Sequence, residues 1–137
     1  MKITYHGHSC LTIEMENGQR VMIDPFITGN PLSDLTAEEV KTDWLLITHG
    51  HSDHIGDMIP IAKENQATVI SIVEIADYAN SRGVDSFGMN IGGKTAVAIE
   101  DLGQIGGANE EFGYSKYRFT ATWNAEEKII SLDFIGD

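Results

Sequence analysis

The chain has 137 residues, of which 42% are hydrophobic, and it carries 9 Lys and Arg against 21 Asp and Glu, a formal net charge of -12. This length fits a single domain over residues 1–137 with a substantial core, and the hydrophobic fraction excludes a disordered chain. The negative charge repels polyphosphate and argues against nucleic acid as a partner.

No apolar run approaches the length of a membrane span, and the first residues show no secretory signal, so we expect a cytoplasmic protein without a membrane partner. The single cysteine, Cys10, has no second cysteine in the chain with which to form a disulfide, in keeping with a reducing compartment. We expect Cys10 to pack as a small hydrophobic residue.

The first 35 residues predict strands joined by a tight turn. Residues 2–16, KITYHGHSCLTIEME, alternate between apolar and polar side chains and predict one strand. The pair Asn17-Gly18 favours a hairpin turn into an antiparallel strand over residues 20–24. A loop with two prolines follows at residues 25–34, and Thr36 with Glu39 predicts the capping box of a short helix.

The next segments alternate between strand and helix. The run DWLLIT, residues 43–48, predicts a strand buried on both faces, and residues 54–67 place apolar side chains at helical spacing. Residues 68–72 predict another strand, after which Ser71 and Glu74 suggest a capping box for a helix over 73–82 that Gly83 ends. Two further strands are expected in KYRFTATW and KIISLDFI, residues 116–123 and 128–135. The alternation indicates an α/β domain.

Three of the five histidines lie within six positions, directly after the predicted buried strand. The ligand pattern H-x-H-x-D-H comprises His49, His51, Asp53 and His54. Imidazole and carboxylate are ligands that zinc accepts, and the carboxyl end of a parallel strand is where sites gather in α/β folds. If strand geometry persists, His49 and His51 point the same way and meet one ion, while Asp53 and His54 turn toward a second.

The segment THGHSDHIGD, residues 48–57, resembles the signature of the metallo-β-lactamase fold. Residues 1–14, 21–34, 67–78 and 88–93 are similar to the N-terminal half of its uncharacterised metal-dependent hydrolase branch, which is related to ascorbate-phosphate lactonases. The resemblance implies a half or truncated αββα sandwich, a mixed sheet with helices packed on it. It is dense over residues 1–93, whereas residues 94–137 are divergent and rich in predicted strands.

The resemblance also implies roles for single residues. His49 and His51 would bind one divalent metal and Asp53 and His54 a second, with zinc expected and manganese or iron open. Asp53 would also be catalytic as a proton acceptor if one ion is bound.

Two further residues are implied to lie beside these ligands. Asp24 would lie behind them and orient an imidazole, and the alternative is an aspartate that ends a strand in a turn before Pro25. His8 would lie behind the ligands or on the substrate side, whereas we expect His6 to pack.

The chain departs from the family pattern after the motif. No histidine follows His54, and Asn109 stands near the place of the family's third histidine. The resemblance implies that Asp137, in the final Gly-Asp, would correspond to the family's bridging aspartate. The family's remaining strands have no counterpart here, so we expect apolar edges to be covered by self-association into a homo-oligomer.

Two functions are consistent with these observations. The first is a metal-dependent hydrolase that uses a metal-activated water on a small-molecule ester, lactone or phosphodiester. The alternative is a catalytically inactive or truncated domain that self-associates and holds a structural metal or none.

Overall fold

The computed structural model describes residues 1–91, 118–124 and 129–135. Its strands are β1 (Lys2–Tyr5), β2 (Leu11–Glu14), β3 (Arg20–Ile23), β4 (Trp44–Leu46), β5 (Thr68–Ile72), β6 (Ser86–Met89), β7 (Arg118–Asn124) and β8 (Ile129–Ile135). Its helices are the 3-10 helix η1 (Ala37–Glu39), α1 (Ser52–Ile55), α2 (Met58–Asn65) and α3 (Val73–Ser81).

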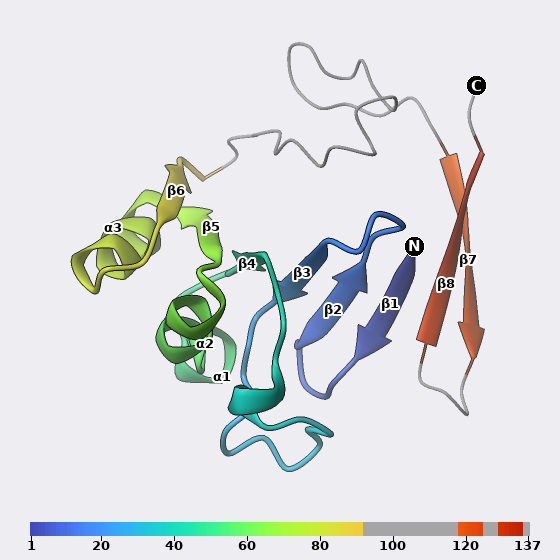
Figure 1. Cartoon of the computed structure of the whole chain (residues 1–137), viewed down its shortest axis with the longest axis horizontal. Helices are drawn as coiled ribbons and strands as arrows, with labels where there is room; N and C mark the ends of the chain where they lie inside the picture. The colour runs from blue at the N-terminus through green and yellow to red at the C-terminus, as the bar shows by residue number, and fades with distance from the viewer. Residues whose placement is uncertain (92–117, 125–128, 136–137) are drawn as a thin grey trace.

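The described strands form one mixed sheet in the order β6-β5-β4-β3-β2-β1-β8-β7. The strands β1, β2 and β3 pair antiparallel, and β3 to β6 pair parallel. Strand β8 pairs antiparallel with both β1 and β7, which places the last two strands beside the first (Figure 1). The predicted α/β class, a mixed sheet with helices packed on it, is confirmed.

The core lies between the centre of the sheet and the helices. Met22, Leu45 and Val69 form one row across β3, β4 and β5, because each is the register partner of the next. They join a buried cluster that includes Ile61 of α2 and Ile75 of α3. The two helices therefore bury their apolar sides against the parallel half of the sheet, as the periodicity of their sequences predicts.

The N-terminal segment contains two strands where the sequence predicts one over residues 2–16. The chain turns between β1 and β2 because Gly7 and His8 have φ angles of +98° and +55°, outside the range of an extended strand. The Cys10 amide donates to the Gly7 carbonyl at 3.0 Å and closes the turn. Alternation along the sequence does not reveal such a turn, since the residues on either side keep the same pattern.

The helix expected over residues 54–67 is divided into α1 and α2. Gly56 lies between them with φ +40°, and a Cβ at this position would stand 2.4 Å from the carbonyl oxygen of Pro25. The close approach of the two backbones requires glycine and interrupts the helix.

One of the two predicted capping boxes is wrong. Ser71 lies within β5, and its hydroxyl donates to the Ile47 carbonyl at 2.7 Å, so it does not cap α3. The other is confirmed, since the Glu39 carboxylate accepts from the Thr36 amide at 2.9 Å, although η1 is a single 3-10 turn. Gly83 follows the end of α3 with φ +82°, as predicted.

Strand direction brings distant segments to one edge of the sheet. Strands β1, β3, β4 and β5 run the same way, so their carboxyl ends share that edge. The turn after β1, the residue after β3 and the histidine motif after β4 therefore lie close together. None of the described helices combines the length and the apolar character that crossing a membrane requires.

Candidate metal centre

The histidine motif occupies the loop after β4 and the first turn of α1. His51 is the residue before α1, and Asp53 and His54 lie within it. The ring centroids of His49 and His51 are 4.8 Å apart, and those of His49 and His54 are 3.9 Å apart. The structure thus gathers the imidazoles of the motif.

Asp24 directly follows β3, and its side chain forms hydrogen bonds with the loop that carries the histidine motif. It is 1% exposed and has φ +48°. Its carboxylate accepts from the Thr48 amide at 2.8 Å, from the Thr48 hydroxyl at 2.6 Å and from Nδ1 of His54 at 2.8 Å. A buried carboxylate with these partners fixes both the start of the loop and the plane of the His54 ring.

These contacts set the proton positions on two imidazoles. Since Nδ1 of His54 donates to Asp24, its Nε2 carries the free lone pair. The Thr48 hydroxyl uses its one proton on Asp24, so at the 3.0 Å contact Nδ1 of His49 must donate to it. In the neutral rings, both contacts therefore favour the tautomer whose Nε2 carries the lone pair that can ligate a metal.

His8 approaches the motif from the turn between β1 and β2. Its Nε2 lies 3.2 Å from Oδ2 of Asp53, while Nε2 of His54 lies 4.0 Å from Oδ1 of the same carboxylate. One ligand atom from each of these three residues falls within 4.8 Å of the other two. The donor set of two imidazoles and a carboxylate fits zinc or a similar divalent ion.

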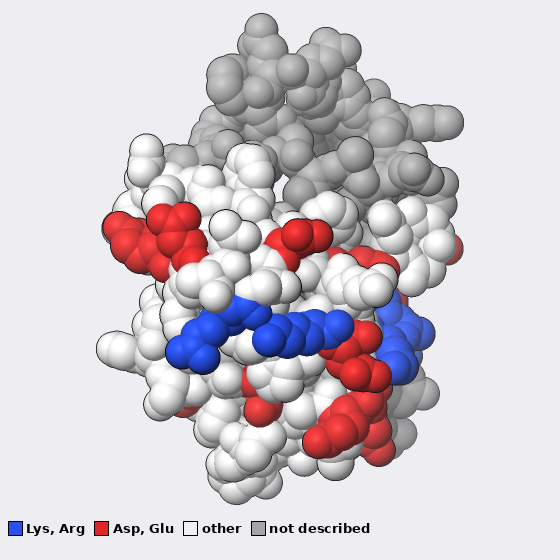
Figure 2. Space-filling view, turned by 60° about the vertical axis from the view of Figure 1, so that its left-hand side comes forward, with Lys and Arg blue, Asp and Glu red and all other residues white. Residues whose placement is uncertain are grey.

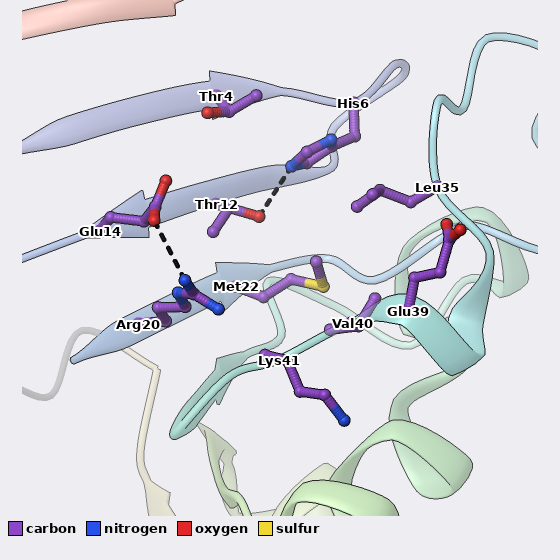
Figure 3. Close-up of a pocket in the computed structure, with 10 residues that line it drawn as sticks. All are labelled: Thr4, His6, Thr12, Glu14, Arg20, Met22, Leu35, Glu39, Val40 and Lys41. Carbon is purple, nitrogen blue, oxygen red and sulfur yellow. Dashed lines mark hydrogen bonds and ion pairs between the residues drawn. The ribbon is translucent and has the colours of Figure 1, made fainter. Parts of the chain in front are cut away.

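His6 is directed elsewhere. It is 6% exposed, its Nδ1 lies 2.7 Å from Oδ1 of Asp34, and its Nε2 lies 2.8 Å from the Thr12 hydroxyl. The ring forms one end of a pocket of about 200 Å³ over the polar side of β1 to β3, with Arg20 toward the other end (Figure 3). Since both of its nitrogens are occupied, His6 has no lone pair to offer a metal in this arrangement.

The loop after β3 is attached to the motif at a second place. The Asp57 carboxylate accepts from the amides of Ile27 at 3.3 Å and Thr28 at 2.8 Å, and the Asp57 amide donates to the Pro25 carbonyl at 2.9 Å. Together with the close approach at Gly56, these contacts hold α1 at a fixed distance from Asp24.

Cys10 lies beneath the turn that carries His8 and is fully buried. Burial, with the nearby carboxylates of Asp24, Asp34 and Asp57 contributing, raises the pKa of the Cys10 thiol from 9.0 to about 12. The residue packs as a neutral thiol, as the sequence predicts.

The structure brings together six of the seven residues expected at the site, namely His49, His51, Asp53, His54, Asp24 and His8. The seventh, Asp137, and the nearby candidate Asn109 lie outside the described residues. The sequence did not predict the roles of Thr48 and Asp57 in holding the loop, because nothing marks them except their positions on either side of the histidine motif.

Charged side chains on the face that carries α3 and β6 are of both signs. Figure 2 shows the basic side chains there as a short band, with acidic side chains above and below it. On this face the acidic side chains around the band, within a chain of net charge -12, oppose the binding of a polyanion.

Comparison with known proteins identifies the family. A family model described as a beta-lactamase superfamily domain matches residues 2–115. The chain belongs to the beta-lactamase superfamily. The metallo-β-lactamase-like fold expected from the motif is thereby confirmed.

Relatives within the superfamily are named UPF0173 metal-dependent hydrolases. The chain is 53% identical to one from Enterococcus faecalis over 69% of this chain and 42% of the relative, and 41% identical to one from Bacillus cereus over 95% of this chain and 61% of the relative. It also resembles the solved structure of Igni18, a metallo hydrolase from Ignicoccus hospitalis, with a TM-score of 0.64 and 32% identity over 99% of this chain and 56% of that one. The chain thus spans about two to three fifths of the length of these superfamily members.

Proposed function

We propose that this chain is a metal-dependent hydrolase acting on an ester, lactone or phosphodiester bond of a small molecule. The observation that carries the proposal is the pair of imidazoles, His49 and His54, whose Nδ1 atoms are held by oxygen acceptors beside the Asp53 carboxylate. Nε2 of His54 lies 4.0 Å from the Asp53 carboxylate, and the His49 ring lies beside the His54 ring. The chain belongs to a superfamily that includes proteins named metal-dependent hydrolases.

Each residue of the motif has a role in this proposal. His49, His51, Asp53 and His54 would hold one or two divalent ions, with zinc the expected metal. When bound, the metal supplies a Lewis acid that lowers the pKa of water toward neutrality and polarises the substrate oxygen. Asp24 keeps the His54 ring in its ligating tautomer, and the half-exposed Asp53 carboxylate can accept a proton from the attacking water. The role of Asp137 as a further ligand stays a prediction.

The direct test is hydrolysis by metal-free protein to which zinc or manganese is returned. The substrates are a p-nitrophenyl ester, a simple lactone and bis(p-nitrophenyl) phosphate, compared for the native chain, Asp53→Asn and Asp77→Asn. Asp77 is an exposed residue of α3 away from the motif, so its variant should match the native chain. We expect metal-dependent turnover that Asp53→Asn abolishes, and turnover that is equal in both variants would refute the proposal.

The alternative is metal binding without turnover, which the donor atoms of His8, Asp53 and His54 within 4.8 Å of one another would be enough to provide. Stoichiometric zinc binding together with no hydrolysis of the three substrates would support this alternative.

We also propose that the chain self-associates. The edge strand of the described sheet, β6, carries Phe87 with 48% of its surface exposed, and Ile91 just beyond it is 89% exposed. An exposed apolar edge is a site of pairing between chains. Sedimentation equilibrium should give a mass above that of one chain, and Phe87→Ser should lower it. The expected cytoplasmic location stays a prediction.

A further inference from the structure

We propose that His8 is itself a metal ligand, supplied to the H-x-H-x-D-H motif by the turn between β1 and β2. This inference rests on the proposed function, because it assumes that a divalent ion binds at the motif. It departs from the expectation that His8 lies only behind the ligands or beside the substrate.

The separations of the polar atoms carry the first step. Two ligands that each lie about 2.0–2.1 Å from a tetrahedral ion are roughly 3.4 Å apart. Nε2 of His8 lies 3.2 Å from Oδ2 of Asp53, and Nε2 of His54 lies 4.0 Å from Oδ1. One ligand atom from each of His8, Asp53 and His54 lies within 4.8 Å of the other two, so side-chain rotations of about an ångström would bring all three to one ion.

The positions of the five histidines also favour His8 as a ligand. The chain has five histidines, and His6 has both ring nitrogens engaged by Asp34 and Thr12. The other four gather at the same edge of the sheet, with the His8 ring centroid 5.0 Å from that of His54. His8 is thus the one histidine outside the motif that can complete a donor set at this edge.

The backbone of the turn gives the third step. His8 has φ +55°, a conformation that a non-glycine residue adopts at a cost in strain. Gly7 permits the turn to pack closely, since a Cβ there would lie 2.6 Å from Cβ of Leu32. The conformation aims the imidazole at Asp53, and its ring also meets the edge of Phe26 at a centroid distance of 5.6 Å.

A contact between a protonated His8 and Asp53 would produce the same geometry without a metal. The two explanations predict different results for His8→Gly. Glycine adopts a positive φ without strain, so this variant should keep or raise the thermal stability of the metal-free protein. If His8 is a ligand, the same variant loses affinity for metal.

The experiment measures zinc affinity by competition with a chelating dye, and the visible spectrum of the Co²⁺-loaded protein, for the native chain, His8→Gly and His8→Asn. Leu32→Ala is the control, because Leu32 packs on the same turn but is an exposed side chain without a donor atom. We expect His8→Gly to lower zinc affinity by about 10- to 100-fold or more, at least the loss seen when a residue that orients a ligand is removed. The Co²⁺ spectrum should change in His8→Gly and stay native in Leu32→Ala.

Each outcome separates the two proposals. Native protein that binds zinc while both His8 variants bind equally well, with unchanged Co²⁺ spectra, would overturn the ligand role of His8 and leave the proposed function standing. Native protein that binds neither metal would overturn both proposals. If His8→Gly does not fold, His8→Asn decides in its place, since asparagine also tolerates a left-handed φ.

Discussion

At the scale of single residues, one buried carboxylate determines how the motif presents its nitrogens. Asp24 accepts two hydrogen bonds from Thr48 and one from His54, so its charge is fully hydrogen-bonded although its side chain is 1% exposed. Removing that charge leaves Thr48 and His54 to compete for a weaker acceptor. Loss of this charge should weaken the preference of His54 for the tautomer that ligates a metal, and so should weaken metal binding.

We therefore expect Asp24→Asn to lower zinc affinity by about 10- to 100-fold, because its single amide oxygen is a weaker acceptor for which Nδ1–H of His54 competes with Thr48. Isothermal titration of the metal-free protein measures this loss. Asp34→Asn is the matched control, since Asp34 pairs with Nδ1 of His6 at 2.7 Å but has no contact with the motif. Equal affinities for the two variants would show that Asp24 has only a structural role.

Cys10 allows a second test at this scale. A thiol whose pKa is raised from 9.0 to about 12 in the folded chain favours folding below pH 9, and this contribution is lost as the pH rises from about 9 to 12. The free energy of unfolding should therefore fall more steeply over this interval in the native chain than in Cys10→Ala. Urea denaturation of the metal-free proteins at several pH values compares the slopes, and parallel slopes would contradict the assignment.

At the scale of elements, the sequence predicts most of the strands but not the turns that position the site. The apolar run before the motif correctly predicts β4, and this alone places His49 at the end of a strand buried within the sheet. The sequence does not reveal the meeting of His8 with Asp53, because the alternation over residues 2–16 predicts one strand without the turn that carries His8. Ser71 shows the same limit, since its hydroxyl bonds to a neighbouring strand that local sequence does not reveal.

The junction at Gly56 makes a prediction for the pairing of two elements. Gly56→Ala places a methyl group 2.4 Å from the Pro25 carbonyl oxygen and 2.7 Å from Cα of Phe26, so it should force the loop after β3 away from α1. We expect a loss of at least about 1–3 kcal/mol in stability, the usual cost of a strained backbone position, and weaker zinc binding in addition. Chemical denaturation and metal titration measure the two effects.

The control for this variant is Gly18→Ala. Gly18 also has a positive φ, +89°, but a Cβ there meets nothing within 4 Å. Gly18→Ala should lose stability through backbone strain alone and should keep the native zinc affinity. If Gly56→Ala behaves like Gly18→Ala, the close approach to Pro25 does not hold the metal centre.

At the scale of the whole molecule, the candidate ligands come from two separate segments, the turn after β1 and the motif after β4. An ion bound there would connect the antiparallel and parallel parts of the sheet. In the unfolded chain the motif can still bind metal locally, but without His8 nearby. The folded state should therefore bind more tightly than the unfolded state, and the difference appears as stability.

We expect zinc to raise the Tm of the native chain. Free zinc at 100 times the dissociation constant would add at most about 2.7 kcal/mol, reduced by any binding to the unfolded motif. His8→Gly should show a smaller rise in Tm than the native chain. Its folded state loses a ligand and so binds zinc more weakly, whereas the zinc affinity of its unfolded state hardly changes. Differential scanning calorimetry with and without zinc measures both rises, with His54→Ala as the variant in which the motif itself is broken. A Tm that zinc leaves unchanged or lowers in the native chain would mean that the two segments do not share an ion in the folded protein.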